Sequence, residues 1–295
     1  MRKVGECVME IKFINTSHNY KGLSKHDIVA AIDNVNLSIN EKDEFIAIVG
    51  KTGSGKSTLI QHINGLLLPT SGSVDVLGNV LTPKKKKNPK LMPIRKKIGF
   101  VFQFPEYQLF EETVLRDIEF APKNFGSSQK EANAHALEAA KIVNLDPKLL
   151  NKSPFNLSGG QMRKVAIAGI LSYNPDVLVL DEPTRGLDPQ GSDEVMDLFY
   201  RINQKMHKTV ILISHSMDNV YKYASRVIVM DNGKVRYDGD KYTLFKSNLY
   251  EKFHLEKPDV LKAIDYLNKE LNLNIDYTPT SLEELEEKLR EVYHE

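Results

Sequence analysis

The segment GKTGSGKST at residues 50–58 constrains the fold of this 295-residue chain more than any other. It follows the apolar run FIAIV and leads into STLIQHI, which has a helical pattern. A glycine-rich loop between a strand and a helix lets backbone N–H groups close on phosphate oxygens, while Lys56 reaches the β- and γ-phosphates and the Ser57 hydroxyl ligates Mg²⁺. The predicted nucleotide contacts of this loop are Gly50, Lys51, Thr52, Gly53, Ser54, Gly55, Lys56, Ser57 and Thr58.

Polar residues at the ends of three further apolar runs indicate the same nucleotide site. Gln103 ends KKIGFVFQ, the pair Asp181 and Glu182 ends VLVLDE, and His215 ends VILISH. Because α/β sheets bind ligands at the carboxyl ends of their strands, we expect these side chains to meet the phosphate loop. Asp181 would supply a second Mg²⁺ contact beside Ser57, and Glu182 would polarise an attacking water. The set predicts hydrolysis of a Mg–nucleotide, with Glu182, His215 and Gln103 as its catalytic residues.

The order of patterns along the chain predicts an α/β fold. Short strands dominate up to about residue 80, and helical periodicity follows from 111 to 144. The run DVLVLDEP is typical of a parallel strand buried on both faces, and TVILISH and RVIVMDNGKV are read as single strands. Alternating strands and helices predict a sheet with residues 105–170 inserted as a helical lobe. The clearest helical face in that lobe comprises Ala132, Ala136, Ala140 and Val143.

The tail from about residue 247 has a different character. Two stretches, DVLKAIDYLNKEL and SLEELEEKLREVY, each carry one apolar stripe at helical spacing. Ser281 and Glu284 form a capping-box pattern at the start of the second. We expect a small helical pair packed on the main domain, with self-assembly through the stripes as the alternative. The stripes are Val260, Ile264, Leu267 and Leu271, then Leu282, Leu285, Leu289 and Val292.

Charge and cysteine content limit the classes of partner. The formal net charge of +1 predicts no strong general attraction to nucleic acid or to an anionic membrane. The single cysteine, Cys7, excludes an internal disulfide and suits a reducing cytoplasm. The lysine run at 84–87 is read as a solvated hairpin tip, because no aromatic residues interleave it as nucleic-acid binding would favour. No apolar run approaches the ~20 residues of a membrane helix, so other subunits would have to hold the protein at a membrane.

A second anion cradle occurs about a hundred residues after the first. In NLSGGQMRKV, residues 156–165, a turn of small residues opens onto a helical run. Free N–H groups and the positive end of a helix dipole converge at such a turn. One nucleotide site does not need two cradles.

These motifs together resemble the ATP-binding-cassette ATPases, over residues 10 to 245. The signature Leu157-Ser158-Gly159-Gly160-Gln161 precedes Asp181-Glu182 by some twenty residues, as in that family. The resemblance implies a P-loop core with an inserted helical subdomain and an antiparallel β subdomain. It also implies that Ser158, Gly159, Gly160 and Gln161 close over the γ-phosphate of ATP held by a second subunit, which explains the second cradle.

The same resemblance assigns further roles. Gln103 would ligate the metal and link it to a transmembrane partner, and His215 would hold the γ-phosphate and the water. The loop that ends in Asp188 would cross the dimer interface, and Tyr20 would stack on adenine. Arg185 departs from the family pattern, because a small residue is usual before Gly-Leu-Asp.

A finer resemblance is to the energy-coupling-factor group of vitamin and metal-ion importers. It rests on IQHINGLLLPTSG, FVFQFPEYQLFEETV, GGQMRKVAIAGIL and a helical C-terminal extension. It implies a heterodimer with a homologous ATPase, a transmembrane coupling subunit and a substrate-binding membrane subunit, at the cytoplasmic face of the membrane. The domains would be residues 9–246 and 247–295. Glu106, Tyr107 and Phe110 are predicted to form the groove for the coupling subunit, because an exposed aromatic patch with a nearby acid usually marks an interface; a buried joint between the lobes is the alternative. Substrate contacts would lie on another polypeptide.

Two rival functions remain at this stage. An ATPase of an ordinary importer shares the nucleotide motifs, but the segment QFPEYQLFEE argues against it. A soluble DNA-repair ATPase would insert long coiled coils between the motifs, whereas only about a hundred residues without heptads separate Ser57 from Ser158.

Overall fold

The computed structural model describes residues 10–21, 28–40, 43–84 and 88–293. Cys7, most of the segment KGLSKHD, Lys85–Lys87 of the lysine run and the side chain of Val292 lie outside the part that is described. Within the described ranges, none of the helices combines the length and apolar character needed to span a bilayer.

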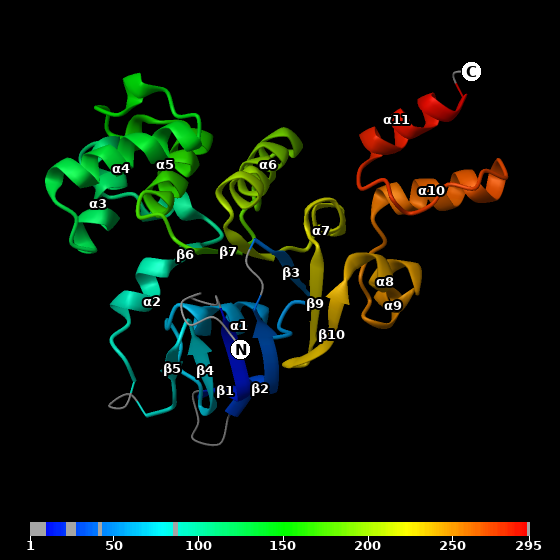
Figure 1. Cartoon of the computed structure of the whole chain (residues 1–295), viewed down its shortest axis with the longest axis horizontal. Coiled ribbons are helices and arrows are strands. Elements are labelled where there is room, and N and C mark those ends of the chain that lie inside the picture. Colours follow the sequence, from blue (N-terminus) through cyan, green and yellow to red (C-terminus); the bar gives the residue numbers. More distant parts are fainter. Residues whose placement is uncertain (1–9, 22–27, 41–42, 85–87, 294–295) are drawn as a thin grey trace, which may run out of the picture.

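A six-stranded sheet forms the centre of the molecule (Figure 1), in the order β10-β9-β3-β8-β7-β6. Strands β3, β6, β7, β8 and β9 run parallel, and β10 pairs antiparallel with β9. The predicted α/β fold is confirmed. The strands are β3 Phe45–Val49, β6 Ile98–Val101, β7 Val177–Asp181, β8 Thr209–Ile213, β9 Arg226–Asp231 and β10 Lys234–Asp240.

An antiparallel sheet of four strands, ordered β2-β1-β4-β5, covers one side of the molecule. Helix α1 (Lys56–Ile63) follows the phosphate loop and shares one buried core with both sheets. Its Leu59, Ile60 and Ile63 are fully buried, which fixes the loop at the helix N-terminus between two rigid layers. The strands are β1 Ile11–Lys21, β2 Ile28–Ile39, β4 Ser71–Val76 and β5 Asn79–Leu81.

A helical lobe lies beside the β6 edge of the central sheet. Ser128 caps α4 in a reciprocal capping box with Glu131, and the predicted face Ala132, Ala136, Ala140 and Val143 is buried. The lobe comprises η2 Pro105–Gln108, α3 Val114–Asn124, α4 Gln129–Ile142, η3 Pro147–Leu149, η4 Pro154–Asn156 and α5 Gly159–Leu171. Helices α2 Met92–Lys97, α6 Pro189–Met206 and α7 Met217–Tyr223 complete the connections between strands.

The run RVIVMDNGKV is a hairpin and not the single strand predicted. The chain turns at Asn232 and Gly233, both at positive φ (48° and 73°), and returns as β10. An Asn-Gly pair between apolar residues favours a tight hairpin turn because both positions accept the left-handed conformation.

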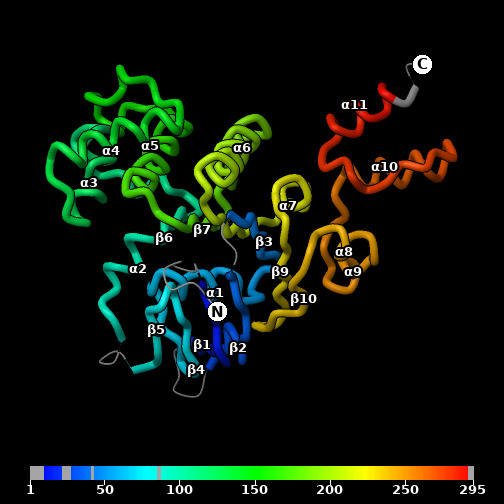
Figure 2. Tube along the Cα trace, viewed as in Figure 1, coloured from blue at the N-terminus to red at the C-terminus, as the bar shows by residue number. Residues whose placement is uncertain are grey.

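The C-terminal helices lie at the opposite end of the molecule from the helical lobe (Figure 2). They are α8 Lys241–Lys246, α9 Leu249–Lys252, α10 Asp259–Glu270 and α11 Leu282–Tyr293. Val260, Ile264 and Leu285 join the buried core that contains α7, so the expected packing on the main domain is observed. Leu271 and Leu282 of the predicted stripes are 59% and 50% exposed, so these two side chains are not part of the buried packing.

The predicted capping box at α11 is only half formed. The backbone N–H of Glu284 donates to the Ser281 hydroxyl, but the Glu284 carboxylate accepts from the backbone of Thr280. The carboxylate thus satisfies a donor one residue earlier than the box would.

Candidate active site

The phosphate loop is shaped by glycines whose positions exclude a side chain. Gly50 and Gly55 have φ of 139° and 101°, where side chains are rare. A Cβ on Gly50 would lie 2.1 Å from the carbonyl oxygen of Met230, and one on Gly55 2.3 Å from that of Ala31. At both glycines the loop therefore packs closely against neighbouring backbone, which holds it at the N-terminus of α1.

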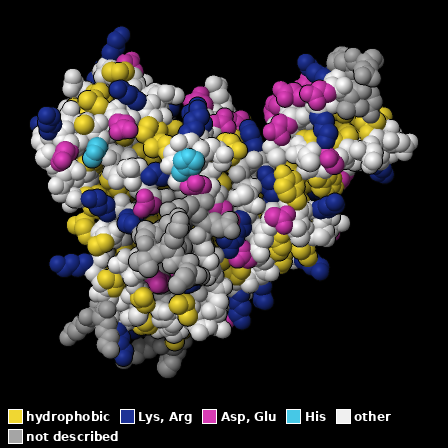
Figure 3. All heavy atoms as spheres, viewed as in Figure 1, with side chains coloured by type: hydrophobic (Ala, Val, Ile, Leu, Met, Phe, Trp, Pro, Cys, Tyr) yellow, Lys and Arg dark blue, Asp and Glu magenta, His cyan; other side chains and the backbone are white. Residues whose placement is uncertain are grey.

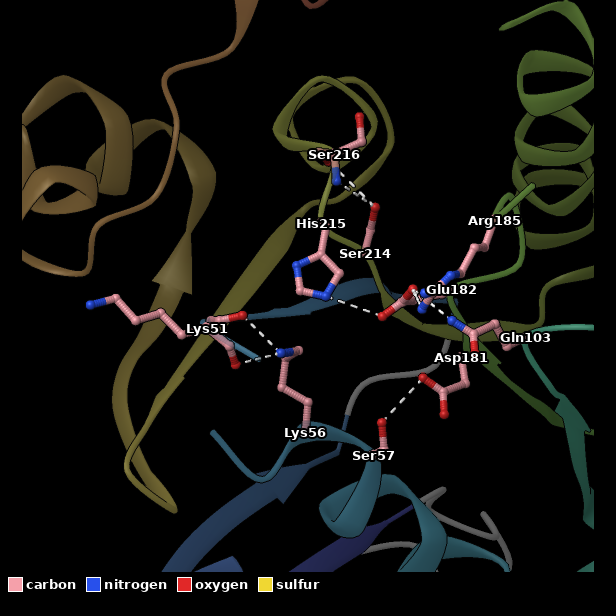
Figure 4. A network of polar contacts seen from close by, with 11 residues as sticks. Lys51, Lys56, Ser57, Gln103, Asp181, Glu182, Arg185, Ser214, His215 and Ser216 are labelled. Carbon is pink, nitrogen blue, oxygen red and sulfur yellow. Dashed lines mark hydrogen bonds and ion pairs between the residues drawn. The ribbon is translucent and has the colours of Figure 1, made fainter. Parts of the chain in front are cut away.

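Lys56 is the buried cation of this loop. Its side chain is 6% exposed, and the ammonium donates to the carbonyl oxygens of Gly50 (2.8 Å) and Lys51 (2.9 Å), as Figure 4 shows. The side chain of Lys51 extends away from the cluster. Burial lowers the pKa of Lys56, and the carboxylates of Glu182 and Asp181 oppose this shift. One of its three N–H donors remains for a ligand.

Ser57 and Asp181 place two oxygen donors side by side. The Ser57 hydroxyl donates to Oδ1 of Asp181 at 3.4 Å, although the two residues are 124 positions apart. Burial and then the charge of Glu182 raise the pKa of Asp181, and Ser57 and Lys56 oppose the shift. A cation between these oxygens would favour the ionised carboxylate.

The carboxylate of Glu182 is held by side chains from three loops. His215 Nε2 lies 3.1 Å from Oε1, while the Gln103 amide (3.0 Å) and Arg185 (3.3 Å) donate to Oε2. All four side chains are drawn together in Figure 4. The structure thus gathers the sequence-predicted strand-end residues, and it adds Arg185. The described hydrogen bond of Gln103 goes to Glu182, so its role as a metal ligand stays a prediction.

The backbone at Glu182 is strained. Its φ is 50°, in the left-handed region, and its N–H donates to the carbonyl oxygen of Ile213 at 3.1 Å. This conformation costs about 1–3 kcal/mol for a residue with a side chain, and such strain concentrates at functional sites. The bend ends β7 abruptly and directs the carboxylate toward His215 and Gln103.

Two adjoining cavities lie over these groups. One, of about 450 Å³, is lined by the phosphate loop together with Tyr20, Ala30, Ala31, Glu182 and His215. The other, of about 400 Å³, is lined by Thr52, Glu182, Thr184, Arg185, Ser214, His215 and Ser216. Tyr20 is 42% exposed, and its hydroxyl lies 3.3 Å from the Thr58 hydroxyl. The ring therefore stands at the mouth of the loop, where a base attached to bound phosphates could reach it.

The signature segment lies on a separate surface. Ser158 is the N-cap of α5, and its hydroxyl accepts from the N–H of Gln161 at 3.3 Å. Ser158, Gly159 and Gly160 are exposed, and a Cβ on either glycine would meet nothing within 4 Å. Among the described residues, neither cavity over the phosphate loop takes any of its lining from this segment. Asp188 is also exposed, and it caps α6 by accepting from Gly191 at 2.9 Å.

Arg163 on α5 forms a buried ion pair that was not predicted from the sequence. Its guanidinium donates twice to the Glu106 carboxylate, at 3.0 and 2.7 Å, and also to the carbonyl oxygens of Pro183 and Arg185, each at 3.3 Å. The side chains of Arg163 and Glu106 are only 4% and 12% exposed. Its spacing of four and eight residues from the buried Ile167 and Leu171 was the available signal.

The predicted interface around Glu106 needs a correction. Glu106 is occupied by Arg163, and so it is not the exposed acid of a docking groove. Tyr107 and Phe110 are 82% and 56% exposed, and Phe110 packs edge-to-face on the partly exposed Phe120. Tyr107 and Phe110 are therefore exposed, as an interface requires, and their role in it stays a prediction.

Comparisons with known proteins agree on one family. Residues 32–185 match the ABC transporter family. The chain is 46% identical, over 96% of each protein, to the energy-coupling factor transporter ATP-binding protein EcfA2 of Bacillus cereus (strain ATCC 10987 / NRS 248). It is 51% identical to the protein of the same name from Ligilactobacillus salivarius (strain UCC118), over 87% of this chain and 89% of that one.

Solved structures show the same resemblance. The protein cbiO1 of Clostridium perfringens, part of the ABC transporter complex cbiONQ, is 34% identical with a TM-score of 0.71. That match covers 88% of this chain and 99% of the other. The ATP-binding cassette MJ0796, in a dimeric post-hydrolysis state bound to ADP and phosphate, is 33% identical with a TM-score of 0.67, over 78% of this chain and 98% of its own.

Proposed function

This chain belongs to the ABC transporter family, among the ATPase subunits of energy-coupling factor transporters, and from that premise we propose that it powers uptake of vitamins or metal ions through membrane subunits. Its activity is ATP hydrolysis coupled to transport. These relatives favour the energy-coupling factor role over an ordinary importer and over DNA repair. The observation that carries the proposal has two parts. Lys56, Ser57, Gln103, Asp181, Glu182 and His215 form one hydrolytic cluster around the cavities, and the signature turn at residues 158–160 is exposed outside these cavities.

The hydrolytic cluster accounts for the chemistry on this chain's side. Phosphoryl transfer requires the charge on the γ-phosphate to be stabilised and the attacking water to be oriented. Lys56 supplies the buried cation. Glu182 is the general base in this proposal, because His215 and Gln103 already fix both of its oxygens beside the cavity. In this proposal His215 would contact the water and the γ-phosphate together.

The donor set at Ser57 and Asp181 suits Mg²⁺. The ion prefers oxygen ligands and is usually bound by one or two carboxylates together with substrate phosphates. The facing oxygens of Ser57 and Asp181 fit that pattern. When bound, Mg²⁺ would neutralise charge that develops on the phosphates. Gln103 is a third candidate ligand through its amide oxygen.

The signature supplies the other side of a composite site. The Ser158 hydroxyl accepts from Gln161 and so keeps its own proton to donate to a phosphate oxygen. Because Ser158 is exposed and lies outside this chain's cavities, we propose that it serves ATP held by a homologous ATPase. Gly159, Gly160 and Gln161 would close with it over that nucleotide, and Asp188 would lie at the interface between the subunits.

The membrane side of the proposal uses the exposed aromatic residues of the helical lobe. Exposed aromatic patches are typical of interface anchors, and Tyr107 directly follows the buried Glu106–Arg163 joint. We assign the ATPase unit to residues 9–246 and a helical extension to 247–295, on the cytoplasmic face of the membrane. Over the face shown in Figure 3, Lys and Arg side chains are interspersed with Asp and Glu, which suits protein partners better than nucleic acid.

Affinity purification from detergent-solubilised membranes tests the role. We expect a tagged chain to retain a homologous ATPase, a transmembrane coupling subunit and a substrate-binding membrane subunit. The double variant Tyr107→Ala/Phe110→Ala should keep the ATPase partner and its melting temperature but lose the coupling subunit. The control is Tyr266→Ala on α10, which removes a 65% exposed aromatic side chain far from the lobe. Undiminished capture by the double variant would defeat the interface assignment.

A further inference from the structure

Thr58 of the phosphate loop and three aromatic residues beside the loop form a closed circuit of contacts. The ring of Tyr20 lies edge-on to that of His18, with centroids 4.7 Å apart, and His18 lies edge-on to His62 at 5.0 Å. Nδ1 of His62 is 2.7 Å from the carbonyl oxygen of Thr58. The hydroxyl of Thr58 closes the circuit with that of Tyr20 at 3.3 Å. The circuit joins β1 to the first turn of α1.

The positions of the protons in this circuit follow from its partners. Nδ1 of His18 lies 3.0 Å from the carbonyl oxygen of Leu68, and Nδ1 of His62 faces that of Thr58. A carbonyl oxygen only accepts, so Nδ1 of each ring carries the hydrogen. Burial lowers the pKa of His62 to about 4, which keeps this imidazole neutral near pH 7. Each ring is thus fixed in orientation by one backbone carbonyl.

Burial decreases along the circuit from His62 to Tyr20, so the buried rings support the exposed one. His62 is fully buried, His18 is 8% exposed and Tyr20 is 42% exposed. Strand β1 shows irregular pairing with β2 on both sides of His18. Beyond these shifts Tyr20 pairs with Val29 in regular register, so the ladder holds the backbone of Tyr20 while the contact with His18 holds its ring.

We propose that His18 is a positioning residue that, backed by His62, holds the ring of Tyr20 ready to stack on the base of the bound nucleotide. The inference rests on the proposed function and deepens it. An aromatic ring fixed before binding loses less conformational entropy when the base arrives, so affinity rises without any new contact to the nucleotide. A stacked ring recognises the face of a base, so selection among purine nucleotides through this contact should be weak.

The test compares binding of ATP with binding of inorganic tripolyphosphate, which has no base. Both are titrated calorimetrically into the full chain in EDTA, where hydrolysis is prevented. Tyr20→Ala should weaken ATP binding by about 5- to 100-fold, as for loss of one stacked base. His18→Ala should weaken it by about 3- to 10-fold, since an aromatic pair contributes less. Tripolyphosphate affinity should stay unchanged in both variants.

A double-mutant cycle separates positioning from general damage. If His18 acts only through Tyr20, His18→Ala should have no further effect on ATP binding in the Tyr20→Ala background. Asn19→Ala, which truncates an exposed neighbour on the same strand, should bind ATP as wild type does. Tyr20→Phe keeps the ring, loses the contact with Thr58 and should retain most of the affinity.

Three results would overturn the inference. They are unchanged ATP affinity in His18→Ala, equal losses for ATP and tripolyphosphate, or additive losses in the double variant. Each leaves the proposed function standing, because the wild-type protein still binds ATP. Failure of the wild-type chain to bind ATP would overturn the proposed function and this inference together.

Discussion

At the scale of single residues, Arg185 is the position where this chain adds a charge to the hydrolytic cluster. Its guanidinium shares Oε2 of Glu182 with Gln103, but the Arg185 side chain is 58% exposed. Exposed ion pairs contribute at most about 1 kcal/mol, so Arg185→Ala should change ATP turnover by less than about tenfold. A steady-state phosphate-release assay measures this. A hundredfold loss would place Arg185 among the catalytic residues.

The sequence predicted the members of this cluster because they follow buried parallel strands, whose carboxyl ends share one edge of a sheet. It did not predict the contact of Arg185 with Glu182, which depends on the left-handed bend at Glu182. The circuit of His18 and His62 was also missed. Its partners are 44 positions apart and touch only through the packing of β1 on α1.

At the scale of elements, Arg163 connects α5 with η2 and with the loop that follows β7. Removing one partner of a buried ion pair leaves the other charged and desolvated, at a cost of about 3–5 kcal/mol. Arg163→Ala should therefore lower the free energy of unfolding by about that amount, measured by denaturant titration. The matched control is Lys164→Ala, whose partner Glu194 is exposed, and it should cost less than about 1 kcal/mol.

A small decrease in the free energy of unfolding of Arg163→Ala, comparable with that of the control, would show that the joint relaxes without Arg163.

Elements with one strong pattern were predicted well, as the buried face of α4 and the parallel strands show. The prediction that Glu106 is an exposed acid failed because the sequence does not reveal that Glu106 pairs with Arg163, which is 57 residues away. The prediction of one strand over residues 226–235 failed because the continuous apolar pattern masks the turn at Asn232-Gly233.

At the scale of the whole molecule, the proposal is that the exposed signature belongs to a site shared between two chains. Ser158→Arg should leave this chain's own ATP affinity unchanged, because its cavity lies elsewhere, and should abolish hydrolysis at the partner's phosphate loop. Ser128→Arg is a matched control. It removes an N-cap with the same capping box from the same lobe, so both variants lose about 1 kcal/mol of helix stability. Loss of this chain's own ATP affinity would mean that the signature acts within one subunit.

The central claim is that Glu182 activates water at a site that this chain builds around Lys56. The most direct measurement is ATP turnover by the purified transporter complex carrying Glu182→Gln, with ATP binding measured on the same sample. The substitution keeps the shape of the side chain and removes its basicity. We predict a fall in turnover by a factor of about 100 or more, as for loss of a general base, with ATP affinity retained. Turnover near that of the wild type would contradict the account.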